Sequence, residues 1–586
     1  MKIFYYQRWL PQLFLFLVVN VAVASLIPAM IIVAEAQWPL KSARTVLANQ
    51  VLPWLSRQPM LAHLAGNPTL HLSISLKMRN AQALDALLTA QNNPHSPWYH
   101  HYLTSQEFTR QFGAEQATVK MACAYMQREG LHVSSVAPNR LLMDVDGPLF
   151  NVEHAFGIRI AQYQLARSIV YAPTTAPSLP SALAGMIVHI GGLDSVAHYH
   201  TYHTVPQVMQ HEQTSTRGGY TPLQLRTAYG IQPLLNDGET GAKQSVAFIE
   251  LDGFNPTDIA NFYSGYHLGT PHYKTILLGG VVNVPSTNAV EVELDMEITA
   301  AIAPQARQLL YMGRNTMQGI NDIYTRIVND NLAKVVSTSW GVCEAALDPA
   351  EQQVLNTIFR QGAAQGQSFF AATGDLGAYD CQNYALAVDS PSDSPYVIGV
   401  GGTSLITYPG GVYKHESAWS CSTCTDGGPY GDGSGGGVSK FFLRPRYQKG
   451  PGIYSLYRTL PDVSANADPR TGYSIYCTVR QSGCSANGWL TVGGTSGSAP
   501  VWTALAVELN QYLAKQHKPV LGNAIALLYE IYSLRGLKYP AFHDITDGNN
   551  LYYAASVNYD LATGIGSPNG WNLARDLARF LPSSKK

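Results

Sequence analysis

Short apolar runs alternate with longer helical patterns along the second half of this 586-residue chain. The runs that we predict to be buried strands are Ser245–Leu251, Lys334–Ser339, Ser368–Ala372 and Tyr396–Val400. The helices predicted between and around them are Thr257–Tyr263, Leu294–Ala303, Ile323–Asn331 and Glu351–Ala364. This alternation is typical of an α/β domain with a parallel sheet and helices on both faces. In such a sheet, functional side chains collect at the carboxyl ends of the strands.

Residues 68–195 have a different pattern. Leu70–Leu76 alternates polar and apolar residues as a half-buried strand does, and a helix is predicted at Ala81–Leu88. The elements predicted after them are a helix near Ala117–Glu129, strands near His132–Val136 and Arg140–Val145, and a helix ending at Phe156. This order indicates an α+β domain of ferredoxin-like type. No constellation of catalytic side chains is visible in it, so we interpret it as an inhibitory or folding domain.

Two segments are predicted to lie outside the folded domains, a targeting segment at the start of the chain and a polar linker between the two domains. The start combines basic Lys2 and Arg8 with an apolar stretch, Leu13–Val33, and a small-x-small site at Ala34–Ala36, as a cleaved signal peptide does. Membrane attachment is expected only if the stretch is retained as an anchor. The second segment, residues 198–219, is polar, rich in histidine and suited to proteolytic processing. The predicted parts are a signal peptide over 1–36, an activation domain over 37–197, a linker over 198–219 and a larger domain over 220–586.

Composition narrows the classes of protein. Charged residues make up 13% of the chain and the formal net charge is −1, which is about half the usual charged share and excludes a basic nucleic-acid surface. A surface so poor in charge suits a protein that works at acid pH.

Cysteine usage agrees with export. Six of the seven cysteines lie beyond residue 200, and an even number in an exported domain indicates disulfides. The predicted pairs are Cys343–Cys381, Cys421–Cys424 and Cys477–Cys484, the last two from proximity alone. A zinc site would need two C-x-x-C pairs, and only Cys421 and Cys424 have that spacing.

The segment 493–500, Gly-Gly-Thr-Ser-Gly-Ser-Ala-Pro, offers a nucleophile. Its glycines permit a tight turn, and the apolar run after it is predicted to be a buried helix. The free N–H groups of a helix N-terminus favour developing negative charge. The tetrapeptide is repeated at 401–404, but neither Ala-Pro nor a long apolar helix follows there. Ser496 is therefore the candidate nucleophile, and Ser404 is the structural copy.

Four carboxylates lie close together in the segment 291–298. On a helix, Glu291 and Asp295 share one face with the apolar Leu294, whereas Glu293 and Glu297 are predicted to face solvent. Two carboxylates at the border of a buried face move each other's pKa apart, which is how an acid/base pair is made.

Further candidates lie where predicted strands end. Asp375 sits in a Gly-flanked loop after Ser368–Ala372, a setting that is also common for plain turn residues. Glu250, at the end of a predicted buried strand, and Trp340 lie at equivalent strand ends.

Taken in order, these motifs resemble the sedolisins, the serine-carboxyl peptidases, and especially their kumamolisin-like members. They are Glu-x-x-x-Asp at 291–295, Ser-x-Ser-Trp-Gly at 337–341, Gly-Asp at 374–375 and Gly-Thr-Ser-x-Ser-x-Pro at 494–500. Residues 96–113, with Ser-Pro-Trp-Tyr, Tyr-Leu-Thr, Glu-Phe and Phe-Gly, resemble the activation domain of that family's zymogens. The resemblance implies a subtilisin-like fold, an inhibitory propeptide and one calcium ion.

The resemblance also implies roles. Ser496 would be the nucleophile, Glu291 the base, Asp295 its orienting partner and Asp375 the oxyanion donor. We hypothesise that Glu250 and Trp340 extend the hydrogen-bond network around Glu291. A histidine base would be protonated at about pH 3–4, where a glutamate titrates, and a protonated Asp375 could donate to the oxyanion.

The calcium site implied by the resemblance lies near the C-terminus. Its ligands would be the side chains of Asp544 and Asp560 and the backbone carbonyls of Ile545, Ser556 and Asn558. Calcium prefers such oxygen ligands. The family usually has glycine where Ser556 and Asn558 stand, and the alternative is that these residues only form turns.

The sequence therefore predicts a secreted, acid-acting peptidase made as a zymogen. It would act on peptides or proteins in an acidic extracellular environment, a periplasm or a lysosome-like compartment, with its own propeptide as inhibitor. Endopeptidase and tripeptidyl-peptidase action both remain open. One alternative is a neutral-pH subtilase, which needs a His-Gly-x-His segment that this chain lacks. The other is a catalytically silent homologue that only binds.

Overall fold

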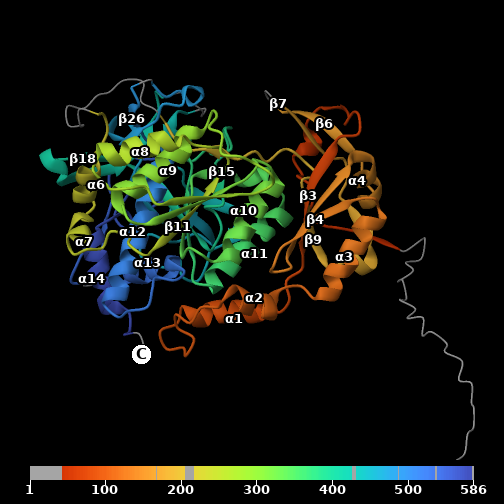
Figure 1. Cartoon of the computed structure of the whole chain (residues 1–586), viewed down its shortest axis with the longest axis horizontal. Coiled ribbons are helices and arrows are strands. Elements are labelled where there is room, and N and C mark those ends of the chain that lie inside the picture. The colour runs from red at the N-terminus through yellow and green to blue at the C-terminus, as the bar shows by residue number, and fades with distance from the viewer. Residues whose placement is uncertain are drawn as a thin grey trace, which may run out of the picture. The chain divides into compact units, whose positions relative to one another are not determined.

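A computed structural model of the chain describes residues 43–165, 168–204, 217–424, 430–485, 487–534 and 537–583 (Figure 1). The predicted signal peptide and residues 205–216 of the predicted linker lie outside these ranges. From Arg44 onward the chain forms one unit by its internal contacts. Within the described ranges, no helix is both long and apolar enough to span a bilayer.

A four-stranded antiparallel sheet forms the centre of the first domain, with the order β4-β5-β3-β9. The strands are β3 (Thr69–Leu76), β4 (His132–Val136), β5 (Leu142–Pro148) and β9 (Ile187–Gly191). The helices are α1 (Ala81–Gln91), α2 (Ser105–Phe112), α3 (Gln116–Arg128), α4 (Leu149–Phe156) and the short α5 (Ser181–Ala184). In chain order the strands lie 2-3-1-4, which confirms the ferredoxin-like prediction. The smaller pieces β2 (Met60–His63), β6 (Ile160–Leu165) and β7 (Ser168–Pro173) form a separate three-stranded sheet.

The first domain packs against the larger one through its sheet and through α1 and α2 (Figure 1). His189 of β9 lies between two carboxylates, 3.1 Å from Asp348 and 2.7 Å from Glu351. Burial alone would lower the pKa of His189, but the two carboxylates raise it to about 10. Near α2, the Leu103 N–H donates to the Ala364 carbonyl at 2.9 Å. The Tyr-Leu-Thr motif of the activation domain is thus a docking segment.

The central sheet of the larger domain has the order β12-β13-β11-β14-β16-β18-β19. Its strands are β11 (Ser245–Glu250), β12 (Tyr273–Leu277), β13 (Arg307–Met312), β14 (Val335–Thr338), β16 (Ser368–Ala372), β18 (Val397–Thr407) and β19 (Tyr413–Ala418). All neighbours are parallel except β18 and β19, and β24 (Val463–Asn466) adds parallel to β18. The four predicted strands are confirmed. The edge strand β12 was not predicted, because its half-exposed side chains do not form an apolar run.

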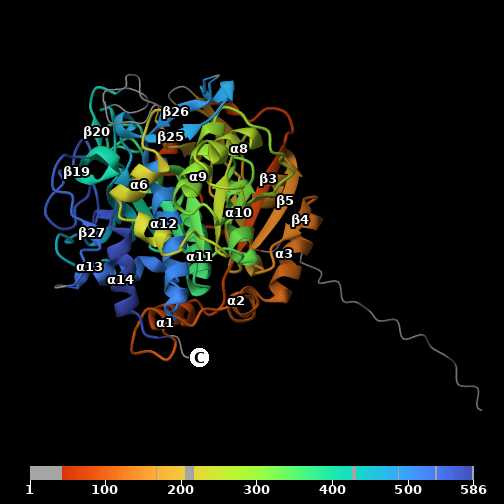
Figure 2. The same cartoon turned by 60° about the vertical axis from the view of Figure 1, so that its left-hand side comes forward.

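Helices cover both faces of this sheet (Figures 1 and 2). On β11, Val246 and Phe248 belong to a buried cluster with residues of α9 (Ala289–Ile302) and α12 (Thr495–Lys515). The alternate residues Ala247 and Ile249 belong to a second cluster with α10 (Met317–Asp330) and α11 (Pro349–Ala364). Because successive side chains of a strand point to opposite faces, these clusters confirm the predicted subtilisin-like arrangement. The remaining helices of this domain are α6 (Pro222–Ala228), α7 (Gln232–Asn236), α8 (Pro256–Gly265), α13 (Ala524–Ser533) and α14 (Gly570–Phe580).

One prediction about α9 is wrong. Glu293 and Glu297 do not face solvent, because every residue of α9 is buried. The helix packs against α12 on one side and against α8 and β25 (Tyr473–Tyr476) on another. The Glu293 carboxylate accepts from the Asn255 N–H at 2.9 Å, and Glu297 accepts from the Tyr476 N–H at 2.7 Å. The prediction failed because amphipathic spacing assumes one solvent-facing side, and a helix enclosed by others has none.

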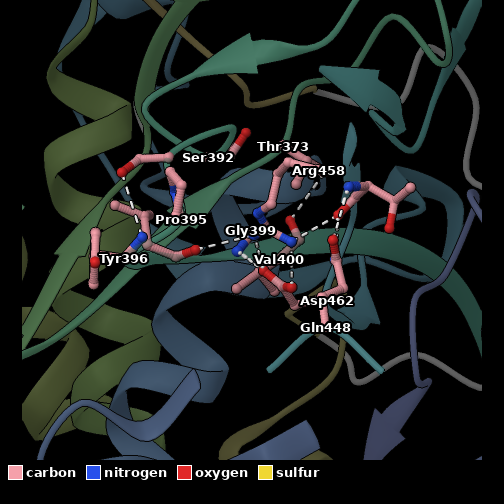
Figure 3. Close-up of polar contacts among 12 residues, drawn as sticks. Thr373, Ser392, Pro395, Tyr396, Gly399, Val400, Gln448, Arg458 and Asp462 are labelled. Carbon is pink, nitrogen blue, oxygen red and sulfur yellow. Dashed lines mark hydrogen bonds and ion pairs between the residues drawn. The ribbon is translucent and has the colours of Figure 1, made fainter. Parts of the chain in front are cut away.

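A buried ion pair between Arg458 and Asp462 fixes the strands beside the site (Figure 3). Asp462 also accepts from the Gly399 N–H in β18 at 2.8 Å. Thr373, just after β16, donates its N–H to the Val400 carbonyl at 3.1 Å. The turn that leaves β16 is therefore anchored to β18.

The three predicted disulfides are present: Cys343–Cys381, Cys421–Cys424 and Cys477–Cys484. Cys123 remains a free thiol. The last of these bridges follows β25, which pairs with β26 (Trp489–Val492), the strand that leads into the serine turn.

Candidate active site

Ser496 is the second residue of α12 and is fully buried. The chain reaches it from β26 through Gly493 and Gly494, and Gly494 has φ of 100°. A Cβ at Gly494 would lie 2.0 Å from the Tyr202 carbonyl oxygen and 2.5 Å from an oxygen of Asp375. Only glycine fits this backbone and this close approach. The tight turn before a helix N-terminus, predicted from the sequence, is therefore present.

Ser404 lies in a different setting, within β18. Its hydroxyl donates to the Asp468 carboxylate at 2.7 Å, and the preceding Thr403 donates to Glu416 at 2.7 Å. Both contacts tie the strand to its neighbours. The prediction that Ser404 is a structural residue agrees with this arrangement.

Glu291 and Asp295 are fully buried on α9, beside the start of α12. Asp295 accepts a hydrogen bond from the Ser339 hydroxyl at 2.7 Å. Burial, and secondly the charge of Glu291, raise the pKa of Asp295 well above its ordinary value. An oxygen of Glu291 lies 2.6 Å from Nδ1 of His203.

Glu250 and Trp340 lie near Glu291 and Asp295 and contact each other. The Trp340 indole N–H donates to Glu250 at 3.1 Å, and both side chains are buried. Burial raises the pKa of Glu250 well above its ordinary value, and the charge of Asp295 adds to the shift. Three acidic side chains thus share one enclosed region, which favours protonated forms in at least part of the group.

Asp375 lies on the other side of the serine turn. Its Oδ1 accepts from the Thr495 N–H and hydroxyl, both at 2.8 Å, at the first residue of α12. Burial raises its pKa well above the ordinary value, although the two hydrogen bonds oppose the shift. Its other oxygen, Oδ2, accepts from the Thr204 hydroxyl at 3.3 Å.

The start of the linker runs through this site. The strand β10 (His200–Thr201) pairs antiparallel with β15 (Trp340–Cys343), and Thr204 forms a bridge with Gly493. Between them the Tyr202 N–H donates to the Ser496 hydroxyl at 3.1 Å, and the Ser496 N–H donates to the Tyr202 carbonyl at 3.0 Å. Residues 200–204 of the predicted linker therefore lie within the site, paired with the larger domain. Local sequence cannot show that a polar segment adds as a strand to a distant one.

Comparison with known proteins accounts for both domains. Residues 60–196 match the family described as "Pro-kumamolisin, activation domain", and residues 283–524 match the one described as "Subtilase family". Kumamolisin of Bacillus sp. (strain MN-32) is 30% identical over 579 residues, which cover 94% of this chain and 99% of kumamolisin. The chain belongs to the sedolisin family.

Two further relatives agree with this assignment. Sedolisin of Pseudomonas sp. (strain 101) is 29% identical over 567 residues, covering 93% of this chain and 92% of sedolisin. A solved structure of Pseudomonas sedolisin, complexed with pseudo-iodotyrostatin, has a TM-score of 0.55 and 29% identity, covering 62% of this chain and all of that one. As a sedolisin-family member, the chain is a serine peptidase with an N-terminal activation domain.

The residues predicted to hold calcium in this sedolisin-family chain lie together in one loop region. Asp560 accepts from the Ser556 N–H at 3.0 Å, and Asp544 accepts from the Asn558 N–H at 2.9 Å. Burial raises the pKa of Asp560 to about 6 and also raises that of Asp544. Ile545 is buried beside them. Asn558 has φ of 71°, the left-handed conformation in which the family usually has glycine.

This donor set fits a calcium ion. It consists of carboxylate and carbonyl oxygens alone; of the two carboxylates, Asp560 is buried and Asp544 is exposed. A second cluster, Asp258, Glu293 and Cys477, has ligand atoms within 4.8 Å of one another. It is unsuited to a metal because Cys477 is in a disulfide.

Three residues that sequence analysis missed belong to the site: Tyr202, Ser339 and Asp389. The Ser-x-Ser-Trp-Gly motif contained a signal for Ser339, but its role as donor to Asp295 depends on how two distant elements meet. Tyr202 and Asp389 carry no local signal, because their contact joins the linker to β17 (Asp389–Ser390).

Proposed function

We propose that this chain is an acid-acting peptidase, made as a zymogen, that forms an acyl-enzyme on Ser496. The observation that carries the proposal is that one peptide segment, residues 202–204, touches the nucleophile and both acidic side chains at once. Ser496 contacts Tyr202, Glu291 contacts His203, and Asp375 contacts Thr204. A groove that holds an extended backbone against a serine at a helix N-terminus is suited to acyl transfer.

The roles follow from this placement. Glu291 takes the hydroxyl proton of Ser496 as Oγ bonds to the carbonyl carbon, and returns it to the leaving nitrogen as the C–N bond breaks. A water molecule then hydrolyses the ester and restores the serine. Asp295, held by Ser339, orients Glu291 and tunes its proton affinity. Glu250 and Trp340 support Asp295 from behind.

The oxyanion would be stabilised by the Ser496 N–H and by Asp375. A carboxyl can donate to an oxyanion only while it is protonated. Burial raises the pKa of Asp375, so the donor form is present in acid and is lost as pH rises through that raised pKa. This requirement favours activity at acid pH.

We further propose export through the N-terminal signal peptide, to an extracellular or other acidic compartment. One calcium ion would be held by Asp544, Asp560 and the carbonyls of Ile545, Ser556 and Asn558. Bound there, the ion would link the loops that carry its ligands and so stabilise the folded domain.

The test is a pH–rate profile on casein with the acid-treated protein and its Ser496→Ala variant. We expect hydrolysis below about pH 5, and none by the variant. A neutral optimum would instead support a neutral-pH subtilase, and no hydrolysis at any pH a silent homologue. Release of three residues at a time from the N-terminus of a peptide would identify a tripeptidyl-peptidase. Cuts within the peptide would identify an endopeptidase.

A further inference from the structure

The start of the linker lies in the site as an extended segment whose backbone is paired on both sides of Tyr202. On the N-terminal side of Tyr202, His200 is paired with Gly341 and Thr201 with Trp340. On its C-terminal side, Thr204 exchanges two backbone hydrogen bonds with Gly493, at 2.8 and 3.1 Å. Backbone pairing on both sides fixes which peptide unit faces the nucleophile.

That peptide unit is the one between Tyr202 and His203. The Tyr202 carbonyl accepts from the N–H of Ser496 at 3.0 Å, so it already occupies the position where a helix N-terminus stabilises an oxyanion. Glu291 lies 2.6 Å from Nδ1 of His203, the residue whose backbone nitrogen would leave. The nucleophile and the proton donor therefore flank one bond.

The Tyr202 side chain fills a closed pocket. It is 2% exposed, and its hydroxyl donates to Asp389 at the far end. One wall is the backbone of β15, where a Cβ at Gly341 would lie 2.5 Å from the Tyr202 hydroxyl oxygen. The ring of His200 packs edge-on against that of Tyr202, with centroids 4.9 Å apart. The pocket thus matches a phenol in shape and provides one acceptor for its hydroxyl.

We propose that Tyr202–His203 is the bond that this enzyme first cuts in its own chain, and that the Asp389 pocket selects tyrosine before the cut. The inference rests on the proposed peptidase function and adds a cleavage position and a substrate preference. In the reaction, Ser496 Oγ bonds to the Tyr202 carbonyl carbon, the bond to the His203 nitrogen breaks, and Glu291 passes the serine proton to that nitrogen. The chain beginning with His203 leaves at this step, and water then hydrolyses the ester, which releases the chain ending in Tyr202 and restores the Ser496 hydroxyl.

A pocket that holds a hydroxyl against a buried acceptor discriminates strongly against an analogue without the hydroxyl, since the acceptor is then left unpaired. Phenylalanine has the same ring but lacks the hydroxyl. We therefore expect peptides with tyrosine before the cut to be cleaved at least tenfold faster, in kcat/KM, than the same peptides with phenylalanine.

The first experiment follows the full-length precursor after acidification, by mass spectrometry at early times. We expect the released N-terminal fragment to end at Tyr202 and the larger one to begin at His203. Reading both new ends separates the first cut from later trimming. The Ser496→Ala precursor, kept free of other proteases, should stay intact. A first cut at another bond would overturn the assigned position.

The second experiment uses a peptide with the sequence of residues 198–208 and its analogues with phenylalanine, leucine or lysine in place of Tyr202. Asp389→Ala should reduce the preference for tyrosine over phenylalanine to within about threefold. The control Asp393→Asn alters another fully buried carboxylate of the same loop, one that is hydrogen-bonded to Glu344 and Ser390, and should keep the preference. Equal rates for tyrosine and phenylalanine in the parent enzyme, or a faster lysine peptide, would overturn the selectivity.

The outcomes distinguish the two proposals. Acid hydrolysis of casein with a different first cut, or without a preference for tyrosine, contradicts this inference and leaves the peptidase function standing. No hydrolysis of casein or of any peptide at any pH contradicts both.

Discussion

The chain contains the same tetrapeptide, Gly-Gly-Thr-Ser, at 401–404 and at 493–496. In the first copy the residues lie within β18, and both hydroxyls donate to carboxylates that bind the strand to its neighbours. In the second copy they turn into α12, and the serine faces the linker. The chemical groups are identical, so the difference in role comes entirely from the backbone and from what surrounds it.

Two features separate the copies. Gly494 has a positive φ, which lets the chain turn into a helix, whereas β18 continues as a strand through 401–404. The helix N-terminus then supplies an N–H beside the second serine. A serine becomes a nucleophile where an oxyanion can be stabilised and a base lies within reach. The four predictions below test this contrast, from the largest expected effect to the smallest.

Exchange of each serine for alanine is the most direct test. Ser496→Ala should lower kcat by about a millionfold, because the acyl-enzyme cannot form. Ser404→Ala should leave kcat within about twofold and cost about 1 kcal/mol of stability, because only one hydrogen bond is lost. Casein hydrolysis at acid pH and thermal unfolding measure the two effects. If Ser404→Ala is the inactive variant, the assignment is reversed.

Each copy of the tetrapeptide contacts one aspartate, Asp375 at the serine turn and Asp468 at β18, and substitution of these aspartates provides a second test. Asp375→Ala removes an oxyanion donor and should lower kcat by roughly 10²–10³. Asp375→Asn keeps a donor that needs no proton, so it should retain more activity and lose less of it as pH rises. Asp468, the partner of Ser404, is the matched control, and Asp468→Asn should change stability but not the pH profile. Equal losses in the two Asp375 variants would contradict the donor role.

Helix α9 offers a similar comparison, because Glu293 is a buried carboxylate on the same helix as Glu291 and Asp295 but lies outside the active site. Burial raises the pKa of Glu293 to about 9 from 4.5, so the folded chain keeps it neutral while the unfolded chain ionises. The contribution of Glu293 to the free energy of unfolding is fully present below its ordinary pKa of 4.5, and it is lost as pH rises toward about 9. Glu293→Gln avoids this loss and should be more stable than the parent at pH 7, by up to roughly 3 kcal/mol.

Thermal unfolding at pH 4 and pH 7 checks this prediction. Activity at acid pH should stay near that of the parent, whereas Glu291→Gln and Asp295→Asn on the same helix should abolish turnover. A Glu293→Gln protein that is destabilised equally at both pH values would show that the carboxylate is charged when folded.

The proposed calcium site lies in C-terminal loops that are connected to the strand of Ser404. Glu416 accepts from both Thr403 and Ser567, so the C-terminal loops are tied to β18. Removing calcium with a chelator should lower stability by about 2.7 kcal/mol relative to a solution at 100 times the Kd. Activity should fall together with folding, and Asp560→Ala should abolish the calcium dependence. An unchanged melting temperature in both cases would exclude the site.

Much of this protein could be predicted from its sequence. Apolar runs located the buried strands, because a strand covered on both faces cannot contain many polar residues. The order of the motifs around Glu291, Asp375 and Ser496 identified the family, and the proximity of the cysteines indicated the disulfides Cys421–Cys424 and Cys477–Cys484. These features depend on neighbours in the chain, so they can be read locally.

Other features were decided only by the tertiary structure. Glu293 is buried because α9 is enclosed by other helices, and its own spacing cannot reveal them. Tyr202 and His203 meet Ser496 and Glu291 because a polar linker adds as a strand to β15. Asp389 meets Tyr202 across 187 positions of sequence. Such contacts depend on how separate elements pack, and a pattern along one chain does not contain that information.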